Sequence, residues 1–541
     1  MRKVFSSLLF LFLLSPAAWA QLKFLERYEV PSEMYEPNFE MTRVEDGIVA
    51  FRTIPEKGLN FRRKLQYFKT DFDLNRSDLI EFPVKEGFDI IGFDVDGEEL
   101  FLLLQKGSAT NSDKYIFKID LESNRGIEVD ANNLLDMELI EFLVLEDKAL
   151  FMGVADRNPV LQIFDLQKNS VITVQGIYNP DTQVLQLRKV PDLNEVEVVI
   201  SREVKNRRRE ILINTYDLEG NLMREVKVNQ FGKPDEEIMD GLLLPMTNYQ
   251  QAMIGSFGYA KRGTYLGMYI MDINEFGEYG FKKYTLEDFP NFYNYLEEKE
   301  KSKKDAEVMK DLEKEKMPTL RNIYSIRDVY STEDSYLVYF DHYNMMNSRG
   351  NTRPGFSSPS SLYRYDRLNR LGYTPYFSDP FYQNTLPNGS SFQVVTDYQY
   401  VSAHFAKISK EGNVIWDNSN TYDNFTTTYS EPFGEIAVVG DDLYHVYVEN
   451  LEVVVSFFRK GEKIFENQRF ELKLIDENER IKDTDPESLR MVHWYDRYFL
   501  LSGNQRVRFQ DESGKEQIRD VFFITKLLVD GDLYQPEESL D

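Results

Sequence analysis

The feature that most constrains this chain is a short pattern that returns at near-regular intervals. In each copy an apolar residue ends a strand-like run, Asp and an aliphatic residue follow, and a turn with Asn or Gly comes next. The five copies are Phe72-Asp73-Leu74, Ile119-Asp120-Leu121, Phe164-Asp165-Leu166, Tyr216-Asp217-Leu218 and Met271-Asp272-Ile273. Their Asp residues are 47, 45, 52 and 55 positions apart. This spacing is the length of one blade of a β-propeller.

Paired apolar runs follow the same rhythm along the whole chain. Residues 90–104 with 115–120, for example, read as neighbouring antiparallel strands joined by turn residues. No alternation of strands with helices appears, so a parallel sheet is not expected. We predict an all-β fold, a single β-propeller domain over residues 21–541. It has seven clear four-stranded antiparallel blades, or eight if an aromatic insertion is itself a distorted blade. The early run Phe24–Val30 could close the ring by pairing with the last blade.

The first twenty residues have the features of a signal peptide. Arg2 and Lys3 precede an apolar run that ends at Leu14, which is too short to span a bilayer. Ala18-Trp19-Ala20 then provides a cleavage site before Gln21. We therefore expect residues 1–20 to be removed and the protein to be exported to the periplasm or outer membrane, or secreted. A retained N-terminal anchor is the alternative, and no transmembrane segment is expected in the mature chain.

Composition narrows the possible functions. The chain has no cysteine, which fits an oxidising compartment and excludes thiolate nucleophiles, cysteine-ligated metals and disulfides. It has 64 basic and 91 acidic residues, a net charge of −27, which becomes −29 without Arg2 and Lys3. Such a surface repels nucleic acid, so no nucleic-acid partner is expected. It keeps an exported protein soluble, and it also suits cationic partners.

Two insertions interrupt the repeats. Residues 288–317 are rich in helix formers and in Glu–Lys pairs four residues apart, so we predict a solvated helix on the rim of the propeller. Asp288 or Asn291 could cap its start, and Pro318 would end it.

The second insertion, residues 343–399, combines loop-forming Gly, Pro, Ser and Asn with many aromatic residues. Disordered linkers rarely have this composition, and long loops in compact domains are often functional. We predict that its aromatic residues bind a partner, and the alternative is that they pack a distorted blade. The candidate binding residues are Tyr363, Tyr365, Tyr373, Tyr376, Phe377, Phe381 and Tyr382.

Other candidate sites have simpler structural explanations. His342, His404, His445 and His493 are spaced near the blade period and could meet at a metal, but each lies in an aromatic strand context that favours a structural role. Asp94-Val95-Asp96-Gly97 resembles the start of a calcium loop but lacks its later ligands. The repeated Asp residues can bind backbone N–H groups of their own turns. We expect no cofactor, no metal site and no catalytic residues.

One segment carries a family resemblance. Ala406, Gly412 and Trp416 have the spacing of the tryptophan-docking repeat of quinoprotein-like propellers, in which Gly forms a turn and Trp packs between blades. The run from His404 to Ser419, the Ala-Trp-Ala signal and the aromatic insertion also resemble uncharacterised exported proteins of Bacteroidota. The resemblance implies a propeller and brings no known active site.

The sequence therefore favours an exported, non-enzymatic β-propeller that binds a protein or an envelope glycan. The alternative is a carbohydrate-active enzyme with carboxylates near the central channel, because 91 acidic residues leave room for such a pair.

Overall fold

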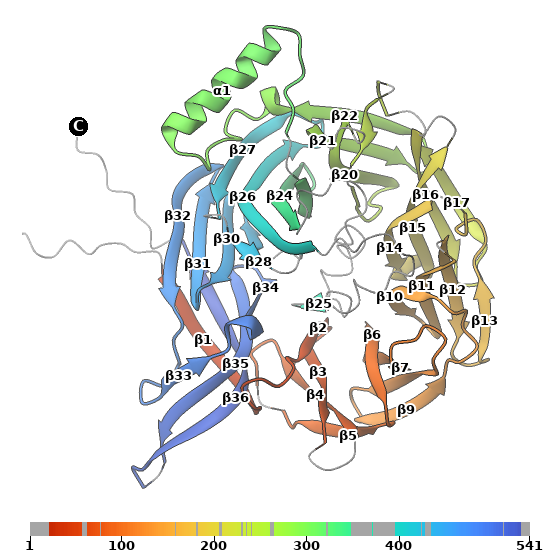
Figure 1. Cartoon of the computed structure of the whole chain (residues 1–541), viewed down its shortest axis with the longest axis vertical. Coiled ribbons are helices and arrows are strands. Elements are labelled where there is room, and N and C mark those ends of the chain that lie inside the picture. Colours follow the sequence, from red (N-terminus) through yellow and green to blue (C-terminus); the bar gives the residue numbers. More distant parts are fainter. Residues whose placement is uncertain are drawn as a thin grey trace, which may run out of the picture.

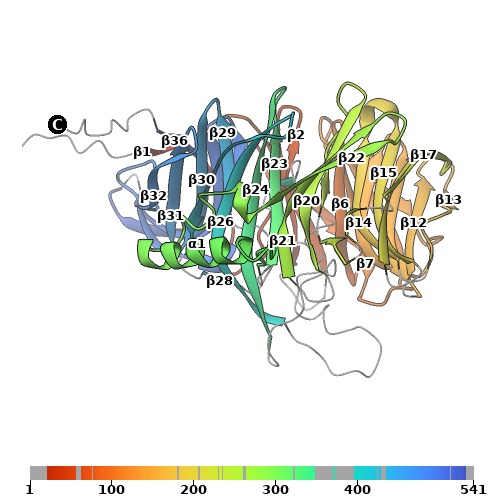
Figure 2. The ribbon, with the colours of Figure 1, turned by 90° about the horizontal axis from the view of Figure 1, so that it is seen from above.

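The computed structural model describes residues 21–531, except 57–61, 76, 157, 180–181, 205–207, 229–230, 234, 240, 260–263, 321–322, 348–369, 372–394, 423–424, 428–433 and 512. Its strands form eight antiparallel sheets around a central axis, an eight-bladed β-propeller (Figure 1). Figure 2 shows the ring edge-on as a disc. The predicted fold class is confirmed, with eight blades.

The first four blades follow one another along the chain, and in each the strands pair in sequence order. Figure 1 shows, for example, β10 and β14 near the axis and β13 and β17 at the rim. Blade 1 consists of β2 (Glu40–Val44), β3 (Gly47–Pro55), β4 (Arg63–Asp71) and β5 (Ile80–Val84). Blade 2 consists of β6 (Phe88–Asp96), β7 (Glu99–Lys106), β8 (Lys114–Asp120) and β9 (Arg125–Asp130). Blade 3 consists of β10 (Glu138–Leu145), β11 (Lys148–Ala155), β12 (Asn158–Asp165) and β13 (Ser170–Thr173). Blade 4 consists of β14 (Thr182–Val190), β15 (Glu195–Val204), β16 (Arg208–Asp217) and β17 (Leu222–Val228).

The last four blades have more irregular inner strands. Blade 5 consists of β18 (Glu237–Ile238) and β19 (Leu242–Leu243), which both pair with β20 (Gln250–Tyr259), then β21 (Thr264–Asn274) and β22 (Tyr279–Thr285). Blade 6 consists of β23 (Ile323–Ser331), β24 (Ser335–Asn347), β26 (Val395–Ser409) and β27 (Val414–Thr421), with β28 (Thr426–Thr427) paired to β26. Blade 7 consists of β29 (Glu435–Val439), β30 (Asp442–Glu449), β31 (Glu452–Arg459) and β32 (Glu462–Glu471). Blade 8 consists of β33 (Arg480–Thr484) and β34 (Arg490–Tyr495), which both pair with β35 (Tyr498–Gln510), then β36 (Glu516–Asp530) and β1.

The ring is closed by its N-terminal strand, as the run Phe24–Val30 predicted. β1 (Gln21–Pro31) pairs antiparallel with β36 and is the outermost strand of blade 8. Tyr28 and Val30 of β1 are buried. The two ends of the described chain therefore share one sheet, and the last blade cannot be completed without residues 21–31.

The repeated Asp residues hold the turns between the third and fourth strands, but two members of the predicted repeat were misaligned. Asp120 and Asp217 each accept backbone N–H bonds from their own turns, as predicted. In blade 1 the acceptor is Asp71 rather than Asp73, and in blade 5 it is Asn274 rather than Asp272. In both blades the third strand ends two residues away from the position that the pattern indicated. The side chain at the end of the third strand therefore holds the turn in each of these blades, and the repeat is aligned by the end of that strand.

The calcium-like sequence at residues 94–97 connects neighbouring blades. Gly97 lies in the tight turn between β6 and β7. Asp94 accepts hydrogen bonds from the backbone N–H of Val144 in blade 3 at 2.6 Å and from Lys189 Nζ in blade 4 at 2.7 Å. Asp96 accepts the N–H of Glu146 at 2.7 Å. Both carboxylates therefore bind blade 3, and Asp94 also binds blade 4.

The predicted tryptophan-docking contact is present between blades 6 and 7. Gly412 has a φ of +83° in the turn that joins β26 to β27, and Ala406 is buried. Trp416 packs against Gly461 in the turn between β31 and β32 of blade 7. Asn418 Nδ2 donates to the carbonyl oxygen of Gly461 at 2.7 Å. This segment therefore fixes the packing of two neighbouring blades.

Replacing Gly461 by Ala should lower the free energy of unfolding by about 2–4 kcal/mol. Gly461 has a φ of +81°, and an added Cβ would lie 2.5 Å from Cγ of Trp416. Gly440→Ala is the matched control, because Gly440 has a φ of +61° but no atom within 4 Å of the added Cβ. Urea denaturation should show a smaller loss for the control, and equal losses would show that Trp416 makes no tight contact with Gly461.

The first insertion forms the predicted helix at the rim. α1 (Glu298–Leu312) follows a 3-10 turn (Leu286–Asp288), and none of the helical residues is buried. Its N-cap is Glu297, so neither Asp288 nor Asn291 caps it. Asp288 instead accepts the N–H of Thr285, and Asn291 donates its N–H to Asp417 of β27 at 3.0 Å. The segment before the helix is thus attached to the outer strand of blade 6. Among the described residues, no helix is long and apolar enough to cross a membrane.

Candidate functional site

The second insertion joins the second and third strands of blade 6, and its predicted binding residues lie outside the described part of the chain. They are Tyr363, Tyr365, Tyr373, Tyr376, Phe377, Phe381 and Tyr382. All eight blades are complete without residues 348–369 and 372–394, so blade 6 is formed by the strands on both sides of the insertion.

The structure describes the stem that carries the insertion. β24 and β26 pair from Ser335↔Ser409 to Asn347↔Val395. They have 13 and 15 residues, whereas the corresponding strands of blade 7, β30 and β31, have 8 each. Figure 2 shows their far ends projecting beyond one face of the disc. The insertion is therefore presented on a two-stranded stem that extends out of the propeller.

The insertion also makes backbone contact with blade 1. Arg370 and Leu371 form β25, which pairs antiparallel with Thr42 and Met41 of β2. β2 is the inner strand of blade 1, and Figure 1 shows β25 near the centre of the ring. A segment of the insertion thus lies beside the propeller axis.

A buried polar network surrounds the base of the stem on the side of blade 7. We call it the Asp341 network, and it consists of Arg327, Tyr339, Asp341, Tyr400, Tyr422 and His445. Asp341 has no exposed surface and accepts three hydrogen bonds. Arg327 Nε and the Tyr422 hydroxyl donate at 2.7 Å, and the Tyr339 hydroxyl donates at 3.0 Å. One cation and two hydroxyl groups therefore donate hydrogen bonds to this buried carboxylate.

Strand geometry explains how these groups meet. Tyr339, Asp341 and Tyr343 alternate along β24, so their side chains lie on one face of the blade. A bulge between Ile326 and Asp328 adds Arg327 to β23 as an extra residue. Its guanidinium group lies 5.2 Å from the ring centroid of Tyr343, and Nη2 donates to the Tyr400 hydroxyl at 3.0 Å.

Burial sets the protonation states of the network. It lowers the pKa of His445 to about 3 and raises the pKa values of Tyr339 and Tyr422 well above their usual range. Burial also opposes the charge of Arg327, but Tyr400 and Asp341 hold its pKa well above the ordinary value. None of these four groups titrates near pH 7, so they are poorly suited to general acid–base catalysis. The network instead locks the base of the stem to blade 7.

A second buried cluster lies on the opposite face of blade 6. The Ser402 hydroxyl lies 3.0 Å from His342 Nδ1 and 2.9 Å from His404 Nε2. The ring of Phe292, from the segment before α1, lies 4.3 Å from the His404 ring, and Tyr324 stacks on His342 at 4.6 Å. Burial lowers the pKa of His342 to about 3 and that of His404 well below its usual value.

The histidines do not gather at a metal site in the part of the chain that the structure describes. His342 and His404 share the Ser402 hydroxyl, His445 belongs to the Asp341 network, and His493 binds the carbonyl oxygen of Asp496. Among the described residues, no group of three or more His, Asp or Glu side chains could hold a metal ion.

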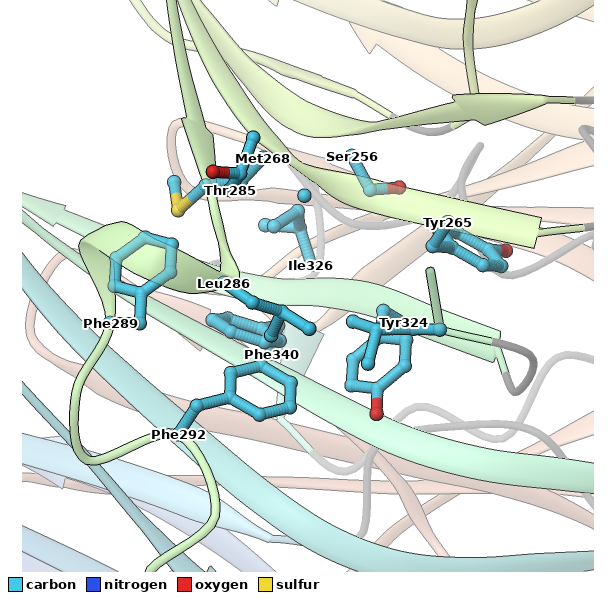
Figure 3. Close-up of a pocket in the computed structure, with 12 residues that line it drawn as sticks. Ser256, Tyr265, Met268, Thr285, Leu286, Phe289, Phe292, Tyr324, Ile326 and Phe340 are labelled. Carbon is cyan, nitrogen blue, oxygen red and sulfur yellow. The ribbon is translucent and has the colours of Figure 1, made fainter. Parts of the chain in front are cut away.

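A small apolar cavity lies beside the second cluster, between blades 5 and 6 (Figure 3). Its volume is about 20 Å³, and its walls include Met268, Phe289, Phe292 and Phe340. The buried Ser256 hydroxyl also lines it and has no hydrogen-bond partner among the described residues. Pockets for small organic ligands measure roughly 300–1,000 Å³, whereas about 10–15 Å³ accommodates one water molecule. This cavity is therefore too small for an organic ligand.

A wider groove of about 420 Å³ lies between the hairpin turns of blades 3 and 4. Its carboxylates include Asp165 and Asp217, which already hold their own turns. Asp165 also pairs with Lys148, whose hydrogen bond is the main reason that the pKa of this carboxyl is lowered. These groups are engaged in local structure.

One carboxylate of an inner strand has unusual acidity. Asp328 follows the bulge of β23, and its carboxylate accepts the backbone N–H of Val329 at 2.7 Å. Burial raises its pKa to about 6. This carboxyl could give or take a proton near neutral pH, which is the property that a general acid needs.

Sequence reasoning placed the insertion but missed the network at its base. From the sequence, only a structural role is expected for His445, and no pattern indicates Arg327 or Tyr422. The alternation Tyr339-x-Asp341-x-Tyr343 is the one signal that could have indicated a charged residue on a buried face, because a buried carboxylate requires partners.

Comparison with known proteins does not assign this chain to a family. No family model and no curated protein matches the chain. Among solved structures, the polysaccharide lyase Uly1 is 9% identical with a TM-score of 0.38, over 94% of this chain and 100% of that one. The β-propeller domain of the Trilobed protease from Pyrococcus furiosus is 9% identical with a TM-score of 0.31, over 79% and 94%.

Prolyl oligopeptidase B from Galerina marginata is 9% identical with a TM-score of 0.35, over 89% of this chain and 55% of that one. The present chain thus spans about half the length of that enzyme. These similarities are too low to support an argument about activity. What is established is the architecture: the chain is an eight-bladed β-propeller whose sixth blade carries a long insertion on a projecting stem.

Proposed function

We propose that this protein is an exported, non-enzymatic β-propeller that binds a protein or an envelope glycan through its aromatic insertion. Tyr363, Tyr365, Tyr373, Tyr376, Phe377, Phe381 and Tyr382 supply the contact surface. Tyrosine and phenylalanine offer large contact areas with few rotatable bonds and are enriched where partners bind.

The observation that carries the proposal is the stem. β24 and β26 extend beyond their blade, and the Asp341 network locks their base with a buried ion pair and two tyrosine hydroxyls. Binding loops are commonly positioned by a rigid scaffold in this way. The buried histidines of blades 6 and 7 are neutral at pH 7, which suits a supporting role.

Export is part of the same proposal. Residues 1–20 act as a signal peptide that is cleaved before Gln21, and the mature protein resides in the periplasm or at the outer membrane, or is secreted. The cysteine-free sequence and the charge of −27 support this location.

Removing the insertion should abolish partner binding and leave the ring folded. Asn347 and Val395 are paired at the end of the stem, so an Asn-Gly turn can replace residues 348–394. Circular dichroism should show an unchanged strand signal. Pull-down from envelope fractions should recover the partner with the full chain and not with the shortened one. Equal recovery by both chains would exclude the insertion as the binding surface.

Asp328 is the one observation that favours the carbohydrate-active enzyme. Its pKa of about 6 would allow it to protonate a leaving group at neutral pH. If this second candidate is correct, release of reducing ends from envelope polysaccharides should fall by at least about 100-fold in Asp328→Asn. No release by the unmodified protein would exclude it.

A further inference from the structure

The distribution of histidine around the ring is uneven. The chain has four His residues, and the first of them is His342, so blades 1–5 contain none. His342, His404 and His445 have at most 3% of their surface exposed. His342 and His404 lie on one face of the β24–β26 pair, and His445 lies on β30 of blade 7, against the other face.

Each buried imidazole faces neutral groups among its described contacts. His342 and His404 share the Ser402 hydroxyl and contact Phe292, Tyr295, Tyr324 and Phe340. His445 bonds the Tyr422 hydroxyl at 3.2 Å and contacts Tyr339, Phe405 and Tyr447. The Tyr422 hydroxyl also donates to Asp341, whose charge is paired with that of Arg327. A proton on any of these imidazoles would be poorly solvated.

From this arrangement we infer that blade 6 and the adjoining face of blade 7 form an acid-sensitive unit, which opens on acidification before blades 1–4 do. The inference deepens the proposed function, since the unit includes the stem of the binding insertion. Acid would then control how firmly the insertion is held. The opening itself does not depend on any partner.

Proton linkage gives the direction of the effect. A buried His with a lowered pKa stays neutral in the closed state, whereas the opened state takes up a proton below its ordinary pKa of about 6.5. Acidification therefore favours opening, from about pH 6.5 down to the pKa of about 3 that His342 and His445 have in the closed state. Between pH 7 and pH 5 each such His increases the opening equilibrium constant by about 25-fold.

Three aspartates of blade 6 act in the opposite direction. Burial raises the pKa values of Asp328 and Asp417 to about 6, so both gain a proton in the closed state as the pH falls. Each of these two reduces the opening constant by about 10-fold over the same range. Burial also raises the pKa of Asp341, against the effect of Arg327. With three histidines favouring opening, the net increase is on the order of 10- to 100-fold.

Hydrogen exchange of the full mature chain tests the inference without a partner. Opening constants at pH 5 and pH 7, corrected for intrinsic exchange rates, should rise by about 10- to 100-fold in β24, β26 and β30. Those of β7, β8, β11 and β12 should change several-fold less. A uniform change around the ring would overturn the inference, whatever the outcome of the pull-down experiments.

Variants identify the groups responsible. His404→Gln and His445→Gln keep an amide near the ring nitrogen that makes the described bond. Each should reduce the rise in the opening constant of blade 6 between pH 7 and pH 5 by about 25-fold, or abolish the measurable rise. His493→Gln is the control, because His493 lies in blade 8 and is only partly buried. If these variants do not fold, the comparison of hydrogen exchange between blades in the unmodified protein remains the test. Folded variants with an unchanged increment would contradict the inference.

Discussion

Replacing Asp341 by Asn should lower the free energy of unfolding by about 3–5 kcal/mol, because the change leaves the Arg327 guanidinium group without its counter-charge in a fully buried site. The new amide would also face the hydroxyls of Tyr339 and Tyr422, which now donate to the carboxylate. Urea denaturation followed by fluorescence measures the loss.

Two comparisons make this test specific. Arg327→Met combined with Asp341→Asn should cost less than the sum of the single changes, since removing both charges leaves no unpaired one. Asp520→Asn breaks a partly exposed ion pair with Arg506 and should cost less than about 1 kcal/mol. A similar small loss for Asp341→Asn would show that the Asp341 network does not hold blade 6.

Removing residues 21–31 should have the largest effect on stability. The deletion takes away the outer strand of blade 8, and the N–H and C=O groups of β36 that point toward β1 lose their partners. It also removes the buried side chains of Tyr28 and Val30, which contribute about 1.5–3 kcal/mol each. We expect a loss of more than about 5 kcal/mol, with aggregation seen in size-exclusion chromatography.

The deleted strand can also be supplied separately. A synthetic peptide of residues 21–31 should pair with β36 and restore part of the melting temperature, whereas a scrambled peptide should not. A truncated chain that melts within about 2 °C of the full one would mean that β1 does not close the ring, because the expected loss should lower the melting temperature by about 5 °C or more in a domain of roughly 500 residues.

The fold could be read from the sequence because a propeller repeats its local signals. Turn residues after each third strand gave the period, and the run Phe24–Val30 had no partner within its own blade. The alignment error at Asp73 and Asp272 has a simple cause. The apolar-Asp-aliphatic triplet follows the strand end at Asp71 in blade 1 but precedes the strand end at Asn274 in blade 5, and only backbone pairing fixes the true end.

The site could be predicted less well, because its groups meet across large sequence distances. Arg327 and His445 are 118 positions apart, and Tyr422 links them through Asp341. Periodicity assigns a residue to a face of a strand but does not name its partner on the next blade. The bulge at Arg327 depends on pairing that the sequence pattern does not contain. The sequence also leaves open whether the insertion is itself a distorted blade, whereas blade 6 is formed by the strands on both sides of it, within residues 323–347 and 395–421.

The most direct test of the proposed function is a matched pull-down from envelope fractions with the full chain and a variant in which Tyr373, Tyr376 and Phe381 are Ser. If these residues contact a partner, the variant should melt at nearly the same temperature and recover at least about 10-fold less of the partner, as expected when a few aromatic residues supply most of the binding energy. If they pack within the protein, the variant should instead lose several kcal/mol of stability. A large loss of stability, with no partner recovered by the unmodified chain, would contradict the proposed function.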